Sequence, residues 1–318
     1  MLKRPLVVVP VGASPGEETT LAYALALAKR READVDLLHV VRPRGPSVFD
    51  SPDLALVGQT SSSSPRHHVA PLQVSSPSDA QISMVDGEDI HVRRVTYKGQ
   101  PAKAVAAYAQ LAMAAVIVVG KYYGSPRWRR STAVVSNLSR SAPVPVLIVP
   151  PQDPADTARR TGPFTNIVSA VDFTVSSAVA LRTALDLARS SGGRVTMVHA
   201  LKNAPGRMVF SGGEALGAID EVHAEAANVA ARLRQEIPAS AASHVDSRVT
   251  TGEPHQGILD VASLVGADLI VMGVPPRGRV DEALFGSTLR GVLRRATTPV
   301  LVLPVVAGAH EWVVGVRP

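Results

Sequence analysis

The segment LVVVPVGASPGEETTLAYALALAKRREADVDLLHV, residues 6–40, has a second copy in the same chain, NIVSAVDFTVSSAVALRTALDLARSSGGRVTMVHA, residues 166–200. Both copies run from a short apolar stretch through a segment with leucines four apart to another apolar stretch. This succession is typical of a β-strand, an amphipathic helix and a second strand. Such units form right-handed crossovers in a parallel sheet. The copies align on identical residues, at Leu21 and Leu181, Leu25 and Leu185, Leu27 and Leu187, Ala28 and Ala188, and His39 and His199.

Two later segments repeat in the same order. GQPAKAVAAYAQLAMAAVIVVG (99–120) matches GEPHQGILDVASLVGADLIVMG (252–273), and PVPVLIVP (143–150) matches TPVLVLP (298–304). Ordered repeats that cover most of each half indicate an internal duplication. A chain of 318 residues accommodates two domains of about 150 residues each. The sequence therefore predicts an α/β protein of two tandem Rossmann-like domains, each an open five-stranded parallel sheet flanked by helices.

The composition between the repeats sets the expected domain boundaries. We expect a first domain over residues 1–150, a linker over 151–163, a second domain over 164–304 and a tail over 305–318 that can pack as an edge strand. Within the first domain, about residues 42–88 form an insertion rich in Ser and Pro. Such a segment cannot bury enough apolar area to offset its chain entropy, so it is predicted to be mobile.

The segment of the second domain that corresponds to the insertion, Gly213–Ile237, is rich in Ala and Glu and predicts a long helix. The β-branched runs predict buried strands of a parallel sheet. The expected strands are Val7–Val11, Asp34–Val41, Val116–Val119 and Val146–Val149 in the first domain, and Ile167–Val171, Arg194–Ala200, Leu269–Met272 and Val300–Leu303 in the second.

The composition excludes several classes of function. The chain has no cysteine, which rules out disulfides, thiolate metal sites and a cysteine nucleophile and fits a cytoplasmic location. No apolar run approaches the ~20 residues that cross a bilayer. The start, residues 1–14, resembles a signal peptide, but its apolar run recurs inside the chain, so we expect a strand there. The net charge of +6 is compatible with anionic ligands.

The loops that follow the first and fourth strands are the expected ligand site, because open parallel sheets bind ligands beyond the carboxyl ends of their strands. In the second domain the first strand ends at Asp172 and the fourth at Gly273. Gly286-Ser287-Thr288 are predicted to open the helix Leu289–Arg295, where backbone N–H groups, a hydroxyl and the helix dipole suit a phosphate.

At this loop the chain resembles the tandem universal stress protein family, whose nucleotide-binding members carry Gly-x2-Gly-x9-Gly-Ser/Thr after the fourth strand. Gly273 and Gly286-Ser287 stand at the first and last positions of that motif. Pro276 stands in place of the second glycine. Proline fixes φ and lacks the backbone N–H donor, and Gly278 partly compensates for this change. The resemblance covers both halves and implies the universal stress protein fold.

The resemblance also implies an ATP site, with or without Mg²⁺, in the second domain, and Asp172 matches the family's aspartate at the nucleoside end. Other residues would line the adenine and ribose, wall the cleft or hold the phosphates. The implied nucleotide-binding residues are Ala170, Val171, Asp172, Ala200, Met272, Gly273, Pro276, Arg277, Gly278, Gly286, Ser287 and Thr288. The alternative is that Gly273 and Gly286 serve only a tight turn and a helix entry.

The first domain departs from the same motif. Gly12 stands in place of the aspartate, and Thr132-Ala133 occupy the Gly-Ser positions, so we expect weak or no ATP binding there. Its loop instead combines basic and aromatic side chains, at Lys121, Tyr122, Tyr123, Arg127, Trp128, Arg129 and Arg130. That combination is compatible with single-stranded nucleic acid. Because no wider basic stripe accompanies it, a solvated or packed loop is the favoured interpretation.

The expected function is that of an ATP-binding protein of stress signalling. The resemblance implies pairing of the fifth strands, which would join the halves as a pseudo-dimer and allow a homodimer, and it leaves the protein partner open. The sequence indicates no catalytic residue or metal ligand, so at most slow ATP hydrolysis is expected. Membrane insertion is not expected either. The main alternative is an interaction module whose nucleotide site has decayed. A weaker one is an enzyme on the same fold class.

Overall fold

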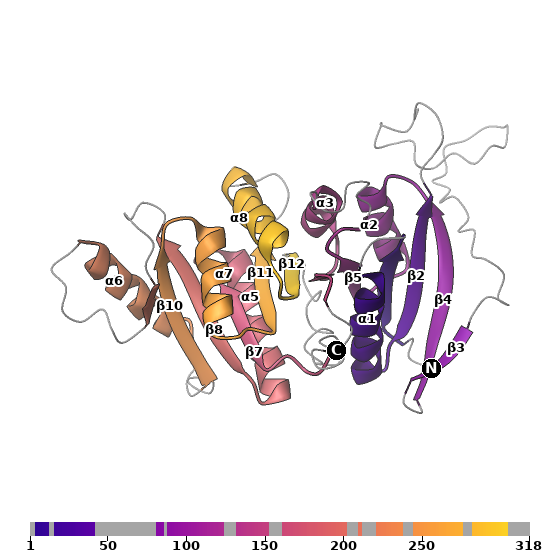
Figure 1. Ribbon diagram of the computed structural model, residues 1–318, viewed down its shortest axis with the longest axis horizontal. Coiled ribbons are helices and arrows are strands. Elements are labelled where there is room, and N and C mark those ends of the chain that lie inside the picture. Colours follow the sequence, from indigo (N-terminus) through magenta and orange to yellow (C-terminus); the bar gives the residue numbers. More distant parts are fainter. Residues whose placement is uncertain are drawn as a thin grey trace.

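The computed structural model describes residues 4–12, 16–41, 81–85, 88–123, 132–152, 161–201, 209–211, 221–237, 244–275 and 282–304. Strands and helices alternate along both halves (Figure 1). The first half contains β1 Leu6–Val11, α1 Glu17–Arg31, β2 Asp34–Val41, β3 Gln81–Val85, β4 Glu88–Lys98, α2 Pro101–Leu111, β5 Val116–Gly120, α3 Ala133–Ser141 and β6 Val146–Val149. The second contains β7 Asn166–Ala170, α5 Val175–Ser191, β8 Arg194–Leu201, β9 Val209–Ser211, α6 Glu221–Gln235, β10 Val245–Thr251, α7 Pro254–Leu264, β11 Leu269–Val274, α8 Glu282–Arg295 and β12 Val300–Pro304.

All the described strands belong to one sheet of 12 strands, in the order β3-β4-β2-β1-β5-β6-β12-β11-β7-β8-β10-β9. Five neighbouring strands in each half are parallel, as the strand–helix alternation predicts. The halves join where β6 pairs antiparallel with β12, with Leu147 opposite Leu301. This seam covers a strand edge of each half, and exposed edges invite aggregation.

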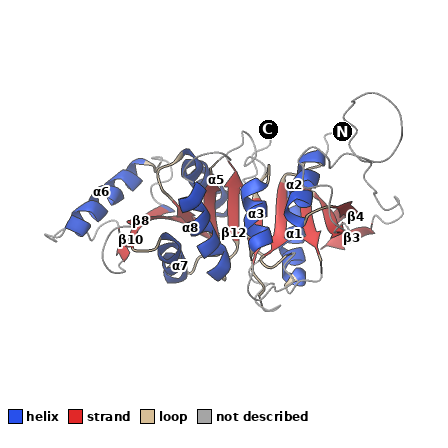
Figure 2. Ribbon diagram, turned by 90° about the horizontal axis from the view of Figure 1, so that it is seen from above, coloured by secondary structure: helices blue, strands red, loops and turns tan. Residues whose placement is uncertain are grey.

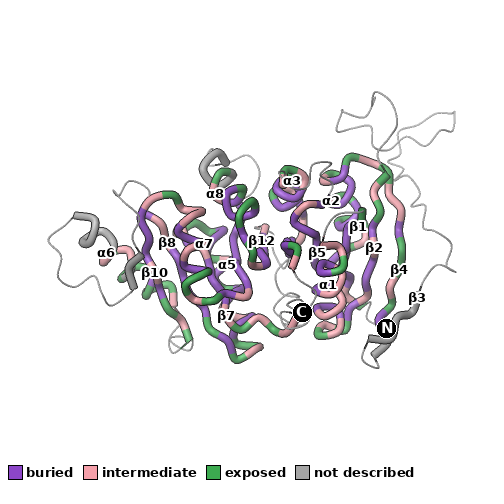
Figure 3. The backbone as a smooth tube through the Cα atoms, viewed as in Figure 1, coloured by how far each residue is buried: buried purple, intermediate pink, exposed green. Residues whose placement is uncertain are grey.

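Helices pack on both faces of the sheet (Figure 2). Alternate side chains of each strand point to opposite faces. Val7 and Val9 therefore enter an apolar core with residues of α1 and α5, while Val8 enters a second core with residues of α2, α3, α7 and α8. The central strands are buried along their length in Figure 3. Burial on both faces explains why the strands read as continuous apolar runs.

The expected strands are confirmed to within two residues at each end, and the α/β fold class is confirmed. Two edge strands were not predicted: β3 pairs antiparallel with β4, and β9 with β10. Strand β3 lies inside the predicted insertion, so residues 81–85 pair with β4, while the mobility of the insertion stays a prediction. Residues 42–80, the tail after residue 304 and residues 153–160 of the linker lie outside the described part. A helix is confirmed within Gly213–Ile237, over Glu221–Gln235.

Candidate functional site

The predicted site lies at the topological switch point of the second half. Strand β7 pairs with β8 on one side and with β11 on the other. The chain leaves β7 toward β8 through α5 and reaches β11 from β10 through α7, so the connections diverge between β7 and β11. The carboxyl ends of these strands meet at one edge of the sheet, where ligands of open α/β folds bind.

Asp172 is the half-buried carboxylate at this edge. Its Oδ1 accepts hydrogen bonds from the backbone N–H of Thr174 at 3.1 Å and from the Thr174 hydroxyl at 2.6 Å. Its own N–H donates to Ser177 Oγ at 3.3 Å. These contacts hold the carboxylate against the first turn of α5, so one oxygen has a structural role in starting the helix.

An aromatic and basic group packs beside Asp172. The next residue, Phe173, has φ 61°, an uncommon value for a residue with a side chain. Its ring lies 5.0 Å from the His199 ring, centroid to centroid, and the Arg232 guanidinium of α6 lies 3.8 Å from its centroid. His199 Nδ1–H donates to the carbonyl oxygen of Val171 at 2.8 Å, which fixes the imidazole at the end of β8. An unusual backbone conformation beside a candidate site is a pointer to function.

The other predicted residues differ in burial and position, and Gly286 lies within α8. Ala170 and Ala200 are half-buried at the ends of β7 and β8, next to Asp172, while Val171, Met272 and Gly273 are buried. Ser287 is exposed and Thr288 half-buried on α8. Three residues lie outside the described part of the chain, and they are Pro276, Arg277 and Gly278.

Gly273 has a packing role that its motif position does not reveal. It lies inside β11, and a Cβ there would lie 2.0 Å from the carbonyl oxygen of Ser176 in α5. Contacts this short do not occur, so the strand and the first turn of α5 approach one another only because residue 273 is glycine. The close approach of helix and strand is therefore one reason for this glycine.

The predicted start of the last helix is wrong. Helix α8 begins at Glu282, so Gly286, Ser287 and Thr288 lie in its second turn rather than at its N-terminus. Only the first four N–H groups of a helix lack an intrahelical acceptor, and these residues come later. Glu282, Ala283 and Leu284 are good helix formers, and their propensity extends the helix past the glycine in spite of its cost.

In the first half, a tyrosine lies beside the exposed position that corresponds to Asp172. A Cβ on Gly12 would lie 3.6 Å from Cε2 of Tyr123, whose side chain is 4% exposed. The ring therefore packs against the end of β1, where the second half has a carboxylate. Weak or no ATP binding in the first half stays a prediction.

Lys121, a member of the predicted basic and aromatic loop, is buried between the halves. Its Nζ donates to the carbonyl oxygen of Ala296, the residue after α8, at 2.8 Å and lies 5.5 Å from the Tyr122 ring centroid. Burial lowers the pKa of Lys121 to about 8. Lys121 and Tyr123 are thus interior, which removes them from any nucleic-acid surface, while Arg127, Trp128, Arg129 and Arg130 lie outside the described residues.

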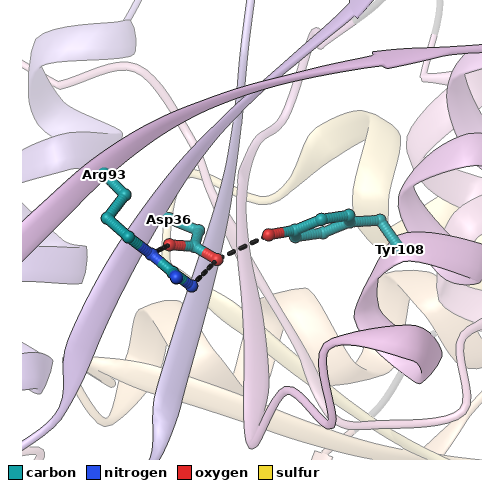
Figure 4. A network of polar contacts seen from close by, with 3 residues as sticks. All are labelled: Asp36, Arg93 and Tyr108. Atoms are coloured by element: carbon teal, nitrogen blue, oxygen red, sulfur yellow. Dashed lines mark hydrogen bonds and ion pairs between the residues drawn. The ribbon is translucent and has the colours of Figure 1, made fainter. Parts of the chain in front are cut away.

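An ion pair between a buried carboxylate and a half-exposed arginine in the first half was not predicted. The carboxylate of Asp36 in β2 is fully buried and accepts two hydrogen bonds from Arg93 of β4, at 2.8 and 2.9 Å, and one from the Tyr108 hydroxyl of α2 at 2.6 Å (Figure 4). The hydrogen bond with Asp36 raises the pKa of Arg93, and burial raises that of Tyr108. Thr196 stands at the equivalent position of the second half. The only signal in the sequence is a charge within an apolar strand.

The described residues hold no cluster of three His, Asp or Glu side chains that could bind a metal. No helix among the described residues is both long and apolar enough to span a bilayer.

Comparison with known proteins finds one family and a shared fold. The model of the Universal stress protein family matches residues 4–150 and 163–304. A universal stress protein from Methanocaldococcus jannaschii is 30% identical over 79 residues, which are 25% of this chain and 48% of that protein. The match thus spans about half the length of this relative.

Two solved structures are similar over nearly the whole chain. A universal stress protein from Archaeoglobus fulgidus has a TM-score of 0.59 at 18% identity, covering 95% of this chain and 97% of its own. A functionally unknown protein from Pseudomonas aeruginosa has a TM-score of 0.56 at 17% identity, covering 97% and 96%. At these identities the likeness concerns the fold.

Proposed function

Because the chain belongs to the universal stress protein family, we propose that its second half binds an adenine nucleotide, ATP in the first instance, and that the protein acts in stress signalling in the cytoplasm. The observation that carries the proposal is the half-buried, preordered carboxylate of Asp172 at the switch point of the sheet. One of its oxygens holds α5, and the other can accept a hydrogen bond from a ribose hydroxyl.

The surroundings of Asp172 support the same assignment. The side chains of Ala170 and Ala200 at the strand ends are small, as close approach of a nucleoside would require, and Ser287 and Thr288 on α8 carry hydroxyls that could contact the phosphates. The proposed role is binding, with ATP hydrolysis slow at most. Binding would shift the packing between the halves, which pair through β6 and β12 as a pseudo-dimer.

A second candidate function is an interaction module that has lost its nucleotide. Two observations favour it. Helix α8 already begins at Glu282, which takes Gly286 away from the helix N-terminus, and Gly273 is explained by packing against Ser176. Under this alternative the motif glycines are structural remnants, and protein partners take over the signalling role.

Calorimetric titration of the full chain with Mg-ATP, with Mg-GTP as the control, distinguishes the two candidates. We expect saturable binding of ATP and a raised thermal midpoint, because ligand at 100 times Kd stabilises the folded state by about 2.7 kcal/mol. Asp172→Asn retains an oxygen that accepts from Thr174 but removes the charge. It is expected to weaken ATP binding at least about tenfold, since hydrogen bonds to charged groups contribute ~1.5–3 kcal/mol.

Asp186→Asn is the matched control, since it removes a carboxylate of α5 that pairs with Arg189 instead of facing the strand ends. It should leave ATP affinity unchanged. Absence of ATP binding at millimolar concentration would favour the interaction module. Binding that Asp172→Asn does not weaken would place the nucleotide elsewhere.

A further inference from the structure

A cavity of about 250 Å³ lies at the seam between the two halves. Its floor includes Leu147 of β6 and Leu301 of β12, which face each other in the antiparallel pair. Leu27 of α1 and Leu187 of α5 line it from the two helices that flank the seam. Figure 1 shows α1 and α5 on either side of this junction. None of the lining residues belongs to the predicted nucleotide site, so the cavity is a separate feature.

The cavity follows the internal duplication of the chain. Leu27 and Leu187 are equivalent residues of the repeated segment, so the apolar lining is nearly symmetric. The polar lining is not. Arg30 and Arg31, at the end of α1, correspond to Ser190 and Ser191, at the end of α5, and all four line the cavity.

The charge of the cavity is concentrated on the α1 side. Burial lowers the pKa of both Arg30 and Arg31, yet an arginine stays protonated in proteins. Arg30 Nη1 donates to the carbonyl oxygen of Thr161, which uses one of the five N–H groups of its guanidinium. The described residues that line the cavity include no acidic side chain.

On the opposite side the two serine hydroxyls donate to backbone carbonyl oxygens. Ser190 Oγ donates to the carbonyl oxygen of Leu187 at 2.8 Å, and Ser191 Oγ donates to that of Phe164. The cavity therefore has an apolar floor, one wall with two cations and one wall whose hydroxyl groups bond to the backbone. A ligand that matches it has an apolar body and a single anionic end.

We propose that this cavity binds a small amphipathic carboxylate of the medium-chain fatty acid class. The carboxylate contacts Arg30 and Arg31, whose planar guanidinium groups match its two oxygens. The alkyl chain lies over the leucines of the seam. Pockets for drug-sized ligands measure about 300–1,000 Å³, so a cavity of about 250 Å³ suits a shorter molecule.

Titration calorimetry of the full chain with octanoate tests the proposal, with hexanoate and octanol as comparison ligands. We expect saturable binding of octanoate. Hexanoate should bind about fifteenfold more weakly, at the usual gain for two buried methylene groups. Octanol has the same chain without the charge and should bind at least about tenfold more weakly.

Two variants test the two halves of the site. Arg30→Ser with Arg31→Ser copies the residues of the second half, which fold at the equivalent helix end, and should weaken octanoate at least about tenfold. Ser190→Trp retains both arginines but fills space beside the floor, and should weaken octanoate to a similar degree. Arg182→Ser with Arg140→Ser removes the same charge at exposed positions that do not line the cavity and should leave octanoate affinity unchanged.

Three results would overturn the proposal. They are no saturable binding of octanoate by the wild-type chain, equal affinity for octanoate and octanol, and unchanged octanoate affinity after both arginines are replaced. All three measurements are made without nucleotide, so they are independent of the outcome for ATP.

Discussion

At the scale of the residue, Gly273 stands at a position of the family motif and is also required to be glycine by the packing of α5 on β11. A Cβ at this residue would lie 2.0 Å from the oxygen and 2.3 Å from the carbon of the Ser176 carbonyl. Gly273→Ala must therefore move α5 away from β11, and we expect it to lower the free energy of unfolding by about 3 kcal/mol, the upper range for overpacking a core. Urea denaturation of both proteins at neutral pH measures the difference.

Gly12→Ala is the matched control from the first half. Its Cβ would make an ordinary contact, 3.6 Å from Tyr123, so the loss should stay below about 1 kcal/mol. If both alanine variants were equally stable, Gly273 would have no packing role, and its motif function would be the remaining explanation.

Sequence spacing predicts Asp172 and Gly273 as site residues because each comes directly after an apolar run that is typical of a strand. It could not identify the group of Asp36, Arg93 and Tyr108, whose members lie 57 and 72 positions apart and meet only when the sheet forms. It also could not tell that Gly273 contacts Ser176. Local pattern locates a residue on an element, but its partners come from the packing of several elements.

At the scale of the element, the two equivalent helices α1 and α5 begin differently. Thr174 caps α5 by accepting a hydrogen bond from the N–H of Ser177, while α1 begins after Gly16 without a side-chain cap. Thr174→Ala should therefore lower the free energy of unfolding by about 1 kcal/mol, the usual value of an N-cap. The midpoint of chemical denaturation reports this loss.

Thr174→Ser provides the control, because serine caps helices as well as threonine does, and it should retain wild-type stability. Equal losses in the alanine and serine variants would show that the methyl group of Thr174, and not its hydroxyl, stabilises the helix start.

The elements were predictable where burial enforces a pattern. Buried parallel strands read as β-branched runs, so their bounds were found within two residues. Strands β3 and β9 have one neighbour each, and their short sequences carry little signal. The sequence misplaces the start of α8 because a glycine such as Gly286 is typical of a helix boundary, although the residues before it favour helix.

At the scale of the whole molecule, the two halves share one sheet, and Lys121 adds a polar contact across their interface. This residue follows β5 of the first half, and its ammonium group donates to the carbonyl oxygen of Ala296, at the end of α8 in the second half. A cation at a helix C-terminus interacts favourably with the helix dipole. The sequence left open whether this basic loop is solvated or packed, because nothing in the local sequence indicates that the other half covers Lys121.

The buried position of Lys121 gives the interface a pH dependence. Burial lowers the pKa of this amine from 10.5 to about 8, so the folded protein releases the proton at a lower pH than the unfolded chain. Below about pH 8 both states hold the proton, and the folded state bears the cost of a buried charge. Between about pH 8 and 10.5 the unfolded chain binds more protons than the folded protein, so stability rises with pH.

Urea denaturation of the wild type and Lys121→Met at pH 7 and pH 9.5 isolates this contribution, because other groups titrate alike in both proteins. Methionine is uncharged, so the variant lacks the cost of the charge. From pH 7 to pH 9.5 the wild type should gain about 2 kcal/mol of unfolding free energy relative to the variant. A difference that stays constant with pH would mean that the bond to Ala296 holds Lys121 protonated throughout. Burial of the ammonium group at the seam would then carry no cost.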